Sequence, residues 1–194
     1  MTPDEMIAAA CALVAQRRAR SERVIVAIDG CGGAGKSTLA RGVQNSIANV
    51  SIVRTDDFFR PLNQFPRGTL APAKAYELYL DWDRMRAEAL VPVREGKTAR
   101  YQRYDWATDA LGEWVITGPN PIVIVEGVYS SRPELRELLD AIIFIDAPRG
   151  VRRRRMLARG HHDSDWMTPW MTAEDWYLEH IRPQDFADLI LHSA

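Results

Sequence analysis

Arg23-Val-Ile-Val-Ala-Ile-Asp29, followed directly by Gly30-Cys-Gly-Gly-Ala-Gly-Lys36-Ser37, is the stretch that decides the fold. The apolar, β-branched run predicts a buried strand, and the residues after Ser37 predict a helix. The glycines between them allow successive N–H groups to turn toward an anion, and the helix N-terminus adds its dipole. The spacing G-x-x-x-x-G-K-S between a strand and a helix therefore predicts a phosphate-binding loop.

The same stretch contains candidate nucleotide-binding residues. Lys36 would carry charge to the β- and γ-phosphates, and the Ser37 hydroxyl would bind Mg²⁺. ATP and Mg²⁺ are therefore the expected cofactors. The expected nucleotide-binding residues are Gly30, Gly32, Gly33, Ala34, Gly35, Lys36, Ser37 and Thr38.

The composition points away from several other classes of protein. A formal net charge of −1 gives no sign of a nucleic-acid or membrane partner. No run is long enough for a membrane span, and the first residues lack the pattern of a signal peptide, so we expect a cytoplasmic protein. Cys11 and Cys31 have no metal-type spacing and are expected to be free thiols.

The remaining pattern predicts one α/β domain over 1–194, with a mainly parallel five-stranded sheet flanked by helices, as in P-loop NTPases. Strands are expected to form from the run after Arg23 and at 51–55, 121–126, 141–146 and 187–191. Helices are expected near 3–20, 36–48, 149–160 and 173–181, and over 73–93 with a break at 80–83 and an end at Pro92.

Two adjacent carboxylates, Asp56 and Asp57, follow the strand at 51–55. Ligands of an open parallel sheet sit beyond the carboxyl ends of its strands. One carboxylate could accept a proton from a substrate hydroxyl, and the other could help to hold Mg²⁺ through water. The alternative is that an aspartate only caps the following turn.

Two further acids, Glu126 and Asp146, end the predicted strands at 121–126 and 141–146. Either acid could organise Mg²⁺ and its waters. The pattern of residues by itself leaves this choice open.

Residues 97–118 predict an inserted β-hairpin rich in aromatic residues, with Tyr104 and Trp106 near its turn. These rings could stack on a flat substrate ring. The alternative is that they pack only on the body of the domain.

The helix expected at 149–160 carries many arginines and opens a region, 149–170, that we interpret as a lid over the phosphates. Solvated charge and contact with nucleic acid are the alternatives. Four consecutive arginines cannot all face one site, because a helix turns about 100° per residue. The run 161–165 is interpreted as a polar lid tip rather than a metal site.

Taken in order, these segments resemble the uridine kinase / phosphoribulokinase family of P-loop kinases, and the resemblance covers nearly all of the chain after residue 22. It implies that Asp56 is the general base and that Glu126, rather than Asp146, acts at Mg²⁺. It further implies that Tyr104 lies where the nucleobase is held, and that Arg155 and Arg159 are the catalytic lid arginines, together with Lys36 of the loop.

The chain also departs from the uridine kinase pattern. Asp109 stands where uridine kinases carry a histidine, and the segment that holds the ribose is only loosely matched by Glu77 or Asp81. Asp56 to Pro61 is similar to nicotinamide riboside kinases. The expected substrate-binding residues are Asp56, Phe59, Glu77, Asp81, Tyr104, Trp106 and Asp109, and the expected metal ligands are Ser37, Glu126 and Asp57.

The resulting hypothesis is an ATP-dependent kinase for the primary hydroxyl of a small molecule, with the 5′-hydroxyl of uridine or cytidine as first candidate. Nicotinamide riboside, pantothenate and sugars stay open as acceptors. A regulatory P-loop ATPase is the alternative from another class. Assembly into a homo-oligomer stays open as well.

Overall fold

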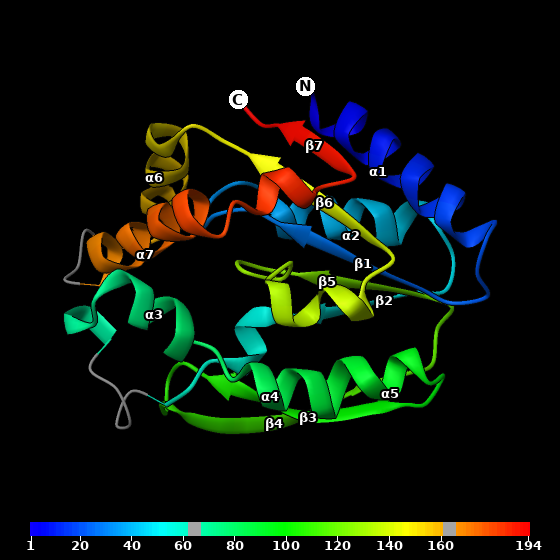
Figure 1. Ribbon diagram of the computed structural model, residues 1–194, viewed down its shortest axis with the longest axis horizontal. Helices are drawn as coiled ribbons and strands as arrows, with labels where there is room; N and C mark the ends of the chain where they lie inside the picture. The colour runs from blue at the N-terminus through cyan, green and yellow to red at the C-terminus, as the bar shows by residue number, and fades with distance from the viewer. Residues whose placement is uncertain (62–66, 161–165) are drawn as a thin grey trace.

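The computed structural model describes residues 1–61, 67–160 and 166–194, so the expected lid tip at 161–165 lies outside the described residues. Five parallel strands form the main sheet in the order β2-β5-β1-β6-β7 (Figure 1). These are β1 (Val24–Asp29), β2 (Val50–Arg54), β5 (Ile122–Glu126), β6 (Ala141–Asp146) and β7 (Leu189–His192). The predicted α/β fold with a five-stranded parallel sheet is confirmed, and β1 lies at its centre.

Two helices, α1 (Pro3–Arg18) and α2 (Lys36–Ser46), cover one face of the sheet. The start of α1 is a capping box, in which Thr2 and Glu5 exchange hydrogen bonds between side chain and backbone. A Cβ atom on Gly42 of α2 would lie 2.4 Å from Cδ1 of Ile7, so a side chain at this position would displace the Ile7 side chain. The two helices therefore pack against each other as well as against the sheet.

The other face carries a second apolar cluster, to which α3 (Pro72–Leu78), α7 (Met167–His180) and the hairpin contribute. Between α3 and the hairpin run α4 (Trp82–Arg84), a π-helical segment (Met85–Leu90) and α5 (Val91–Arg94). The arginine-rich helix α6 (Arg149–Ala158) lies beside α7 near the end of the sheet that carries the loop after β1 (Figure 1). Short 3-10 turns complete the described chain at Thr55–Phe58, Arg67–Thr69, Pro133–Leu138 and Pro183–Phe186.

Two predicted helix boundaries were wrong. Pro92 does not end its helix, because the preceding π-helical turn, in which the Val91 N–H bonds to Arg86 O, places Pro92 in the first turn of α5. A missing N–H is tolerated in a first turn, and the helix continues to Arg94. Helix α7 begins at Met167 rather than near 173, because Trp170 is buried in this part of the helix and stacks on Tyr79 at 5.4 Å.

The predicted hairpin is confirmed as β3 (Ala99–Asp105) paired with β4 (Ala110–Thr117). It is tied to the turn after β2 by the Phe58 and Tyr101 rings, whose centroids are 4.7 Å apart. Arg84 donates one hydrogen bond to Gln102 O of the hairpin and another to Asp57 O. The segment that carries Asp56 is therefore held from the sheet and from the hairpin.

Asp29, at the end of β1, is completely buried and accepts hydrogen bonds from three parts of the chain. The donors are the N–H of Gly30 at 2.6 Å, the N–H of Tyr129 at 3.1 Å, the N–H and hydroxyl of Ser131 at 3.0 and 2.5 Å, and the Tyr177 hydroxyl at 2.6 Å. A buried carboxylate is tolerated when it is hydrogen-bonded in this way. Asp29 thereby joins the phosphate-binding loop to the turn after β5 and to α7.

Glu174 of α7 is a second fully buried carboxylate, on the other side of the same loop. It accepts a hydrogen bond from the Gly32 N–H at 2.5 Å and pairs with the buried Arg152 of α6 at 2.8 Å. Arg152 also donates to Ala147 O at the end of β6. The carboxylate therefore connects α6, α7 and the loop through one ion pair and one backbone contact.

We expect Glu174→Ala to lower the free energy of unfolding by about 3–5 kcal/mol, because it leaves the buried Arg152 guanidinium with only the longer pairing, at 3.6 Å, to the half-exposed Asp175. The matched control is Glu179→Ala on the same helix, whose side chain is 80% exposed. It should change the free energy of unfolding by less than about 0.5 kcal/mol. Urea denaturation of both variants measures the difference, and equal losses would contradict the role assigned to Glu174.

Candidate active site

The phosphate-binding loop folds as its glycines require. Gly30 has a φ of 141°, and a Cβ atom there would lie 2.5 Å from Ile145 O of β6. Gly33 has a φ of 77°, and its Cβ would lie 2.6 Å from Arg152 O. Side chains at either position would push β6 or α6 away from the loop, so these glycines fix how closely the neighbouring elements approach.

The side chains expected to bind phosphate and metal lie together at the start of α2. The Lys36 ammonium is buried and donates to Cys31 O at 3.0 Å, so the lysine curls back over the loop. The Ser37 hydroxyl donates to Oε2 of Glu126, at the end of β5, at 3.2 Å. Burial raises the pKa of the Glu126 carboxyl, and the nearby Lys36 charge opposes that shift. This arrangement puts a hydroxyl, a carboxylate and an ammonium beside the loop.

A cavity of about 200 Å³ opens over this group, and we call it the central cavity. Its polar wall contains Lys36, Ser37, Asp56 and Glu126, and its other wall is largely aromatic and sulfur-containing. The remaining lining residues are Gly32, Gly33, Phe59, Trp106, Gly127, Val128, Met156, Arg159, Trp166, Met167 and Trp170. The phosphate-binding loop and Asp56 therefore line the same cavity.

A wider cavity of about 960 Å³ lies between the end of β2 and the hairpin, and we call it the hairpin cavity. Asp56 and Trp106 line both this cavity and the central one. The other lining residues are Arg54, Asp57, Arg103, Tyr104, Asp105, Ala107, Gly112 and Glu113. Asp56 thus stands where a molecule in the hairpin cavity would meet one in the central cavity.

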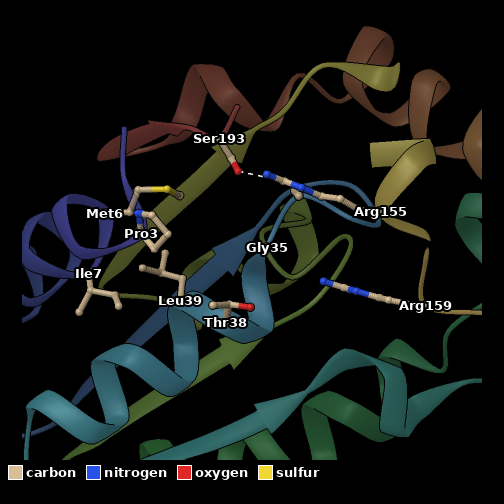
Figure 2. Close-up of a pocket in the computed structure, with 10 residues that line it drawn as sticks. Pro3, Met6, Ile7, Gly35, Thr38, Leu39, Arg155, Arg159 and Ser193 are labelled. Atoms are coloured by element: carbon tan, nitrogen blue, oxygen red, sulfur yellow. Dashed lines mark hydrogen bonds between the residues drawn. The ribbon is translucent and has the colours of Figure 1, made fainter. Parts of the chain in front are cut away.

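A third cavity, of about 230 Å³, lies on the other side of the loop, and we call it the α1 cavity (Figure 2). Its walls come from α1, from the loop and first turns of α2, from α6 and from Ser193 after β7. It is lined by Pro3, Met6, Ile7, Ala34, Gly35, Thr38, Leu39, Arg155, Arg159 and Ser193.

The two adjacent aspartates separate in the structure. Asp56 is exposed at the two cavities, whereas Asp57 is half-buried and accepts a hydrogen bond from the Tyr101 hydroxyl at 3.2 Å. Burial raises the pKa of the Asp57 carboxyl, and the Tyr101 hydrogen bond opposes that shift. Asp57 therefore turns toward the hairpin, while Ser37 and Glu126, the other two expected metal ligands, contact each other.

The expected aromatic residues gather where the hairpin meets the turn after β2. The Phe59 ring lies 4.7 Å from Trp106 and 5.9 Å from Tyr104, measured between centroids. The Tyr104 hydroxyl donates to Asp109 at 2.5 Å, and Asp109 has a φ of 51° in the hairpin turn. Trp106 remains 54% exposed, so one ring face is accessible to a ligand.

The two loosely matched acids lie elsewhere. Glu77 is exposed on α3 and pairs with Lys74 at 2.7 Å rather than lining either cavity beside Asp56. Asp81 caps α4 by accepting from the Arg84 N–H at 3.1 Å, and it also pairs with Arg60 at 3.4 Å. A capping role accounts for Asp81 without a substrate.

The arginines of α6 divide by position. Arg155 donates to Gly33 O at 3.3 Å, to the Ser193 hydroxyl at 2.9 Å and to Ala194 O at 2.6 Å, so it connects the loop to the chain after β7. Arg159 is exposed and lines both the central and the α1 cavities. Arg152 is buried against Glu174.

Sequence reasoning missed Asp29, Glu174 and the α1 side chains that line a cavity. A charged residue at the end of a fully apolar strand was a usable signal for Asp29. Glu174 carries no such signal, because it contacts Gly32, which lies 142 residues earlier in the sequence.

Burial raises the pKa of the Cys31 thiol well above its usual value, in keeping with a small residue tolerated by the loop.

Comparison with known proteins identifies a family and several relatives. The family model for the phosphoribulokinase / uridine kinase family matches residues 25–194. A uridine kinase of Alkaliphilus metalliredigens is 27% identical over 180 residues, covering 87% of this chain and 86% of that protein. A uridine kinase of Deinococcus deserti is 27% identical over 164 residues, covering 82% and 78%.

Solved structures show the same fold. One, described as a possible uridine kinase from Bacillus stearothermophilus, aligns with a TM-score of 0.78 at 21% identity, covering 98% of this chain and all of that one. Another, from Silicibacter sp. TM1040 and named as a fructose transport system kinase, aligns with a TM-score of 0.68 at 25% identity over the full length of both chains. The loop, the sheet order and the family match over nearly the whole chain together lead to one conclusion: the chain belongs to the phosphoribulokinase/uridine kinase family of P-loop kinases.

Proposed function

We propose that this kinase transfers the γ-phosphate of ATP to the primary hydroxyl of a small neutral or cationic molecule, with the 5′-hydroxyl of uridine or cytidine as first candidate. The observation that carries the proposal is the position of Asp56. Its carboxylate borders the central cavity with Lys36, Ser37 and Glu126, and it also borders the hairpin cavity. An acceptor in the hairpin cavity would bring its hydroxyl to Asp56.

In this proposal Asp56 is the general base. It takes the proton of the acceptor hydroxyl as that oxygen attacks the γ-phosphorus, while the bond from phosphorus to the β,γ-bridging oxygen breaks and ADP leaves. Lys36 neutralises charge on the β- and γ-phosphates. Arg159 is the arginine proposed to face the transferred group, since it lines the central cavity, whereas Arg155 lines the α1 cavity.

Ser37 and Glu126 are the residues proposed to hold Mg²⁺. Their oxygen atoms are 3.2 Å apart, and hydroxyl and carboxylate oxygens suit this ion. The described residues contain no cluster of three or more acids, histidines or cysteines that could hold a metal alone. That fits Mg²⁺, which keeps several waters and shares its coordination with substrate phosphates. Asp57 is left out of the proposed site because it contacts Tyr101.

The charge around the hairpin cavity favours an acceptor without an anionic group. Among the described lining residues, Asp56, Asp57, Asp105 and Glu113 face only two guanidiniums. Arg54 pairs with Glu126 at 3.8 Å and Arg103 pairs with Glu113. A phosphate or carboxylate on the acceptor would be repelled by the surplus acids. Nucleosides, which carry no anionic group, are therefore better candidates than pantothenate.

Nicotinamide riboside is the second candidate. Its ring is cationic, and cations are attracted to aromatic faces and to carboxylates. The exposed Trp106 ring provides such a face beside Asp56 and Asp105, and the buried rings of Phe59 and Tyr104 pack against it.

The acceptor is tested by measuring ADP formation with ATP and Mg²⁺ in the presence of uridine, cytidine, nicotinamide riboside, pantothenate or simple sugars. We expect one nucleoside to stimulate turnover strongly and pantothenate to have no effect, because the acids of the hairpin cavity repel its carboxylate. Stimulation by pantothenate alone would overturn the charge argument. Hydrolysis unaffected by any acceptor would favour a regulatory ATPase.

Asp56→Asn should lower turnover with the best acceptor by about 10²–10⁴-fold, because the proton of the attacking hydroxyl loses its acceptor. The affinity for ATP, measured by titration calorimetry, should stay close to that of the wild type. Asp57→Asn is the matched control, since it removes the same charge one residue away and should lower turnover far less. Equal losses in the two variants would show that Asp56 is not the base.

Glu126→Gln should raise the Mg²⁺ concentration that gives half-maximal turnover, because the amide removes the negative charge that attracts the ion. Asp146→Asn is the control, as Asp146 ends the neighbouring strand β6 and pairs with His192 at 3.3 Å. It should leave the Mg²⁺ dependence unchanged. A changed Mg²⁺ dependence in Asp146→Asn, with an unchanged one in Glu126→Gln, would assign the metal to Asp146.

A further inference from the structure

The α1 cavity has a strongly divided lining (Figure 2). Pro3, Met6, Ile7 and Leu39 form an apolar wall on one side, and Arg155 and Arg159 reach in from the other. Gly35 and Thr38, at the start of α2, form its boundary with the phosphate-binding loop. The cavity is therefore continuous with the loop, on the side away from Asp56 and Glu126.

The order of groups in a nucleoside triphosphate decides what this cavity could receive. The proposed function places the γ-phosphate at the central cavity, near Asp56, Lys36 and Glu126. The nucleoside is at the opposite end of the phosphate chain, so it must leave the loop on another side. Of the three cavities described, the α1 cavity is the one that borders Thr38 without bordering Asp56.

The lining suits a flat heteroaromatic ring. Binding sites for such ligands are mostly apolar with a few fixed polar groups, and a guanidinium can lie against a ring face. The Arg155 guanidinium is already held by Gly33 O, the Ser193 hydroxyl and Ala194 O. Little freedom would therefore be lost when a ring inserts between Arg155 and the apolar wall.

The apolar wall is itself held in place. Ile7 packs on Gly42 of α2, where a side chain would displace it. The Met1 nitrogen donates to His192 O at 3.2 Å, and Arg17 pairs with Asp188 at 2.5 Å. Helix α1 is thus fixed at both ends against the region of β7, and Met6 is 7% exposed in its position on the cavity.

We propose that α1 is part of the nucleotide site, and that Met6 and Ile7 form the wall against which the base of the phosphate donor packs. This helix lies outside residues 25–194, the part of the chain that the family model matches. The proposal rests on the proposed function only for the direction in which the triphosphate lies along the loop. It assigns a ligand contact to a helix that the sequence predicted without any candidate site residue.

The test compares ATP with inorganic tripolyphosphate, which has the phosphates but no base, by titration calorimetry of the full chain. Met6→Ala should weaken ATP binding about tenfold, because it removes apolar contact with the base. The affinity for tripolyphosphate should not change. Met6→Leu should restore most of the ATP affinity, since it returns the apolar volume.

Val14→Ala is the matched control, because Val14 is buried in the same helix but does not line the cavity. It should lower the melting temperature and leave both affinities unchanged. The proposal would be overturned if Met6→Ala weakened the binding of ATP and of tripolyphosphate equally, or if it weakened the binding of neither. It would also be overturned if the wild-type protein bound ATP no more tightly than tripolyphosphate.

The same experiment separates this proposal from the proposed function. A Met6-dependent ATP affinity in a protein that no acceptor stimulates would support the α1 wall and contradict the kinase assignment for those acceptors. Acceptor-dependent turnover with ATP affinity independent of Met6 would support the function and overturn the α1 wall.

Discussion

A carboxylate is buried at the end of the central strand, and its hydrogen-bond donors among the described residues are all uncharged. Its hydrogen bonds hold three segments that are far apart in the sequence. Asp29 accepts from Gly30 at the entry to the loop, from Tyr129 and Ser131 after β5, and from Tyr177 of α7. Because a buried charge is costly unless its hydrogen bonds are satisfied, these segments cannot separate without exposing Asp29 to water or leaving it unpaired. The position of the loop relative to β5, and so of Ser37 relative to Glu126, depends on this constraint.

Glu174 holds the phosphate-binding loop from the other side, and it does so through an ion pair as well as a backbone hydrogen bond. Its charge is balanced by Arg152, and its second oxygen takes the Gly32 N–H. A phosphate-binding loop needs unpaired N–H groups, yet this first part of the loop is already engaged. The proposed binding surface for phosphate therefore begins further along, where the loop turns at Gly33 and enters α2. The arginine-rich helix is connected to this surface by the same ion pair, which places Arg155 and Arg159 at its two neighbouring cavities.

The parts of the fold that follow from local pattern were predictable, and the contacts between distant parts were not. The buried strand, the glycine spacing and the alternating hairpin act over a few residues, so the sequence indicated β1, the loop, α2 and the β3–β4 pair. Asp57 and Asp81 show the limit. The position of Asp57 beside Asp56 suggested a metal, and the family resemblance suggested a substrate for Asp81. In the structure Asp57 accepts from Tyr101 and Asp81 accepts from the Arg84 N–H. The direction of an acidic side chain depends on which donors the fold brings near, and residues 57 and 101 meet only when the hairpin folds back on the turn after β2. The π-helical turn before Pro92 is a further case, because the segment lies against β3 of the hairpin, which comes later in the chain.

The two sides of the loop differ in a way that suits the two ends of a phosphoryl transfer. On the side of β2 and the hairpin, the described walls combine aromatic rings with surplus carboxylates, which favours a neutral or cationic acceptor over an anionic one. On the side of α1, the walls combine aliphatic side chains with two guanidiniums, and the acids that line the other cavities do not line this one. The surplus acids would thus keep the anionic triphosphate out of the hairpin cavity, while Lys36 would hold its γ-phosphate at the central cavity and the base would lie toward α1. The packing of α1 on Gly42 and on the end of the sheet then decides how closely the base is held, because a helix free to move by even a small amount would leave the ring without an apolar partner.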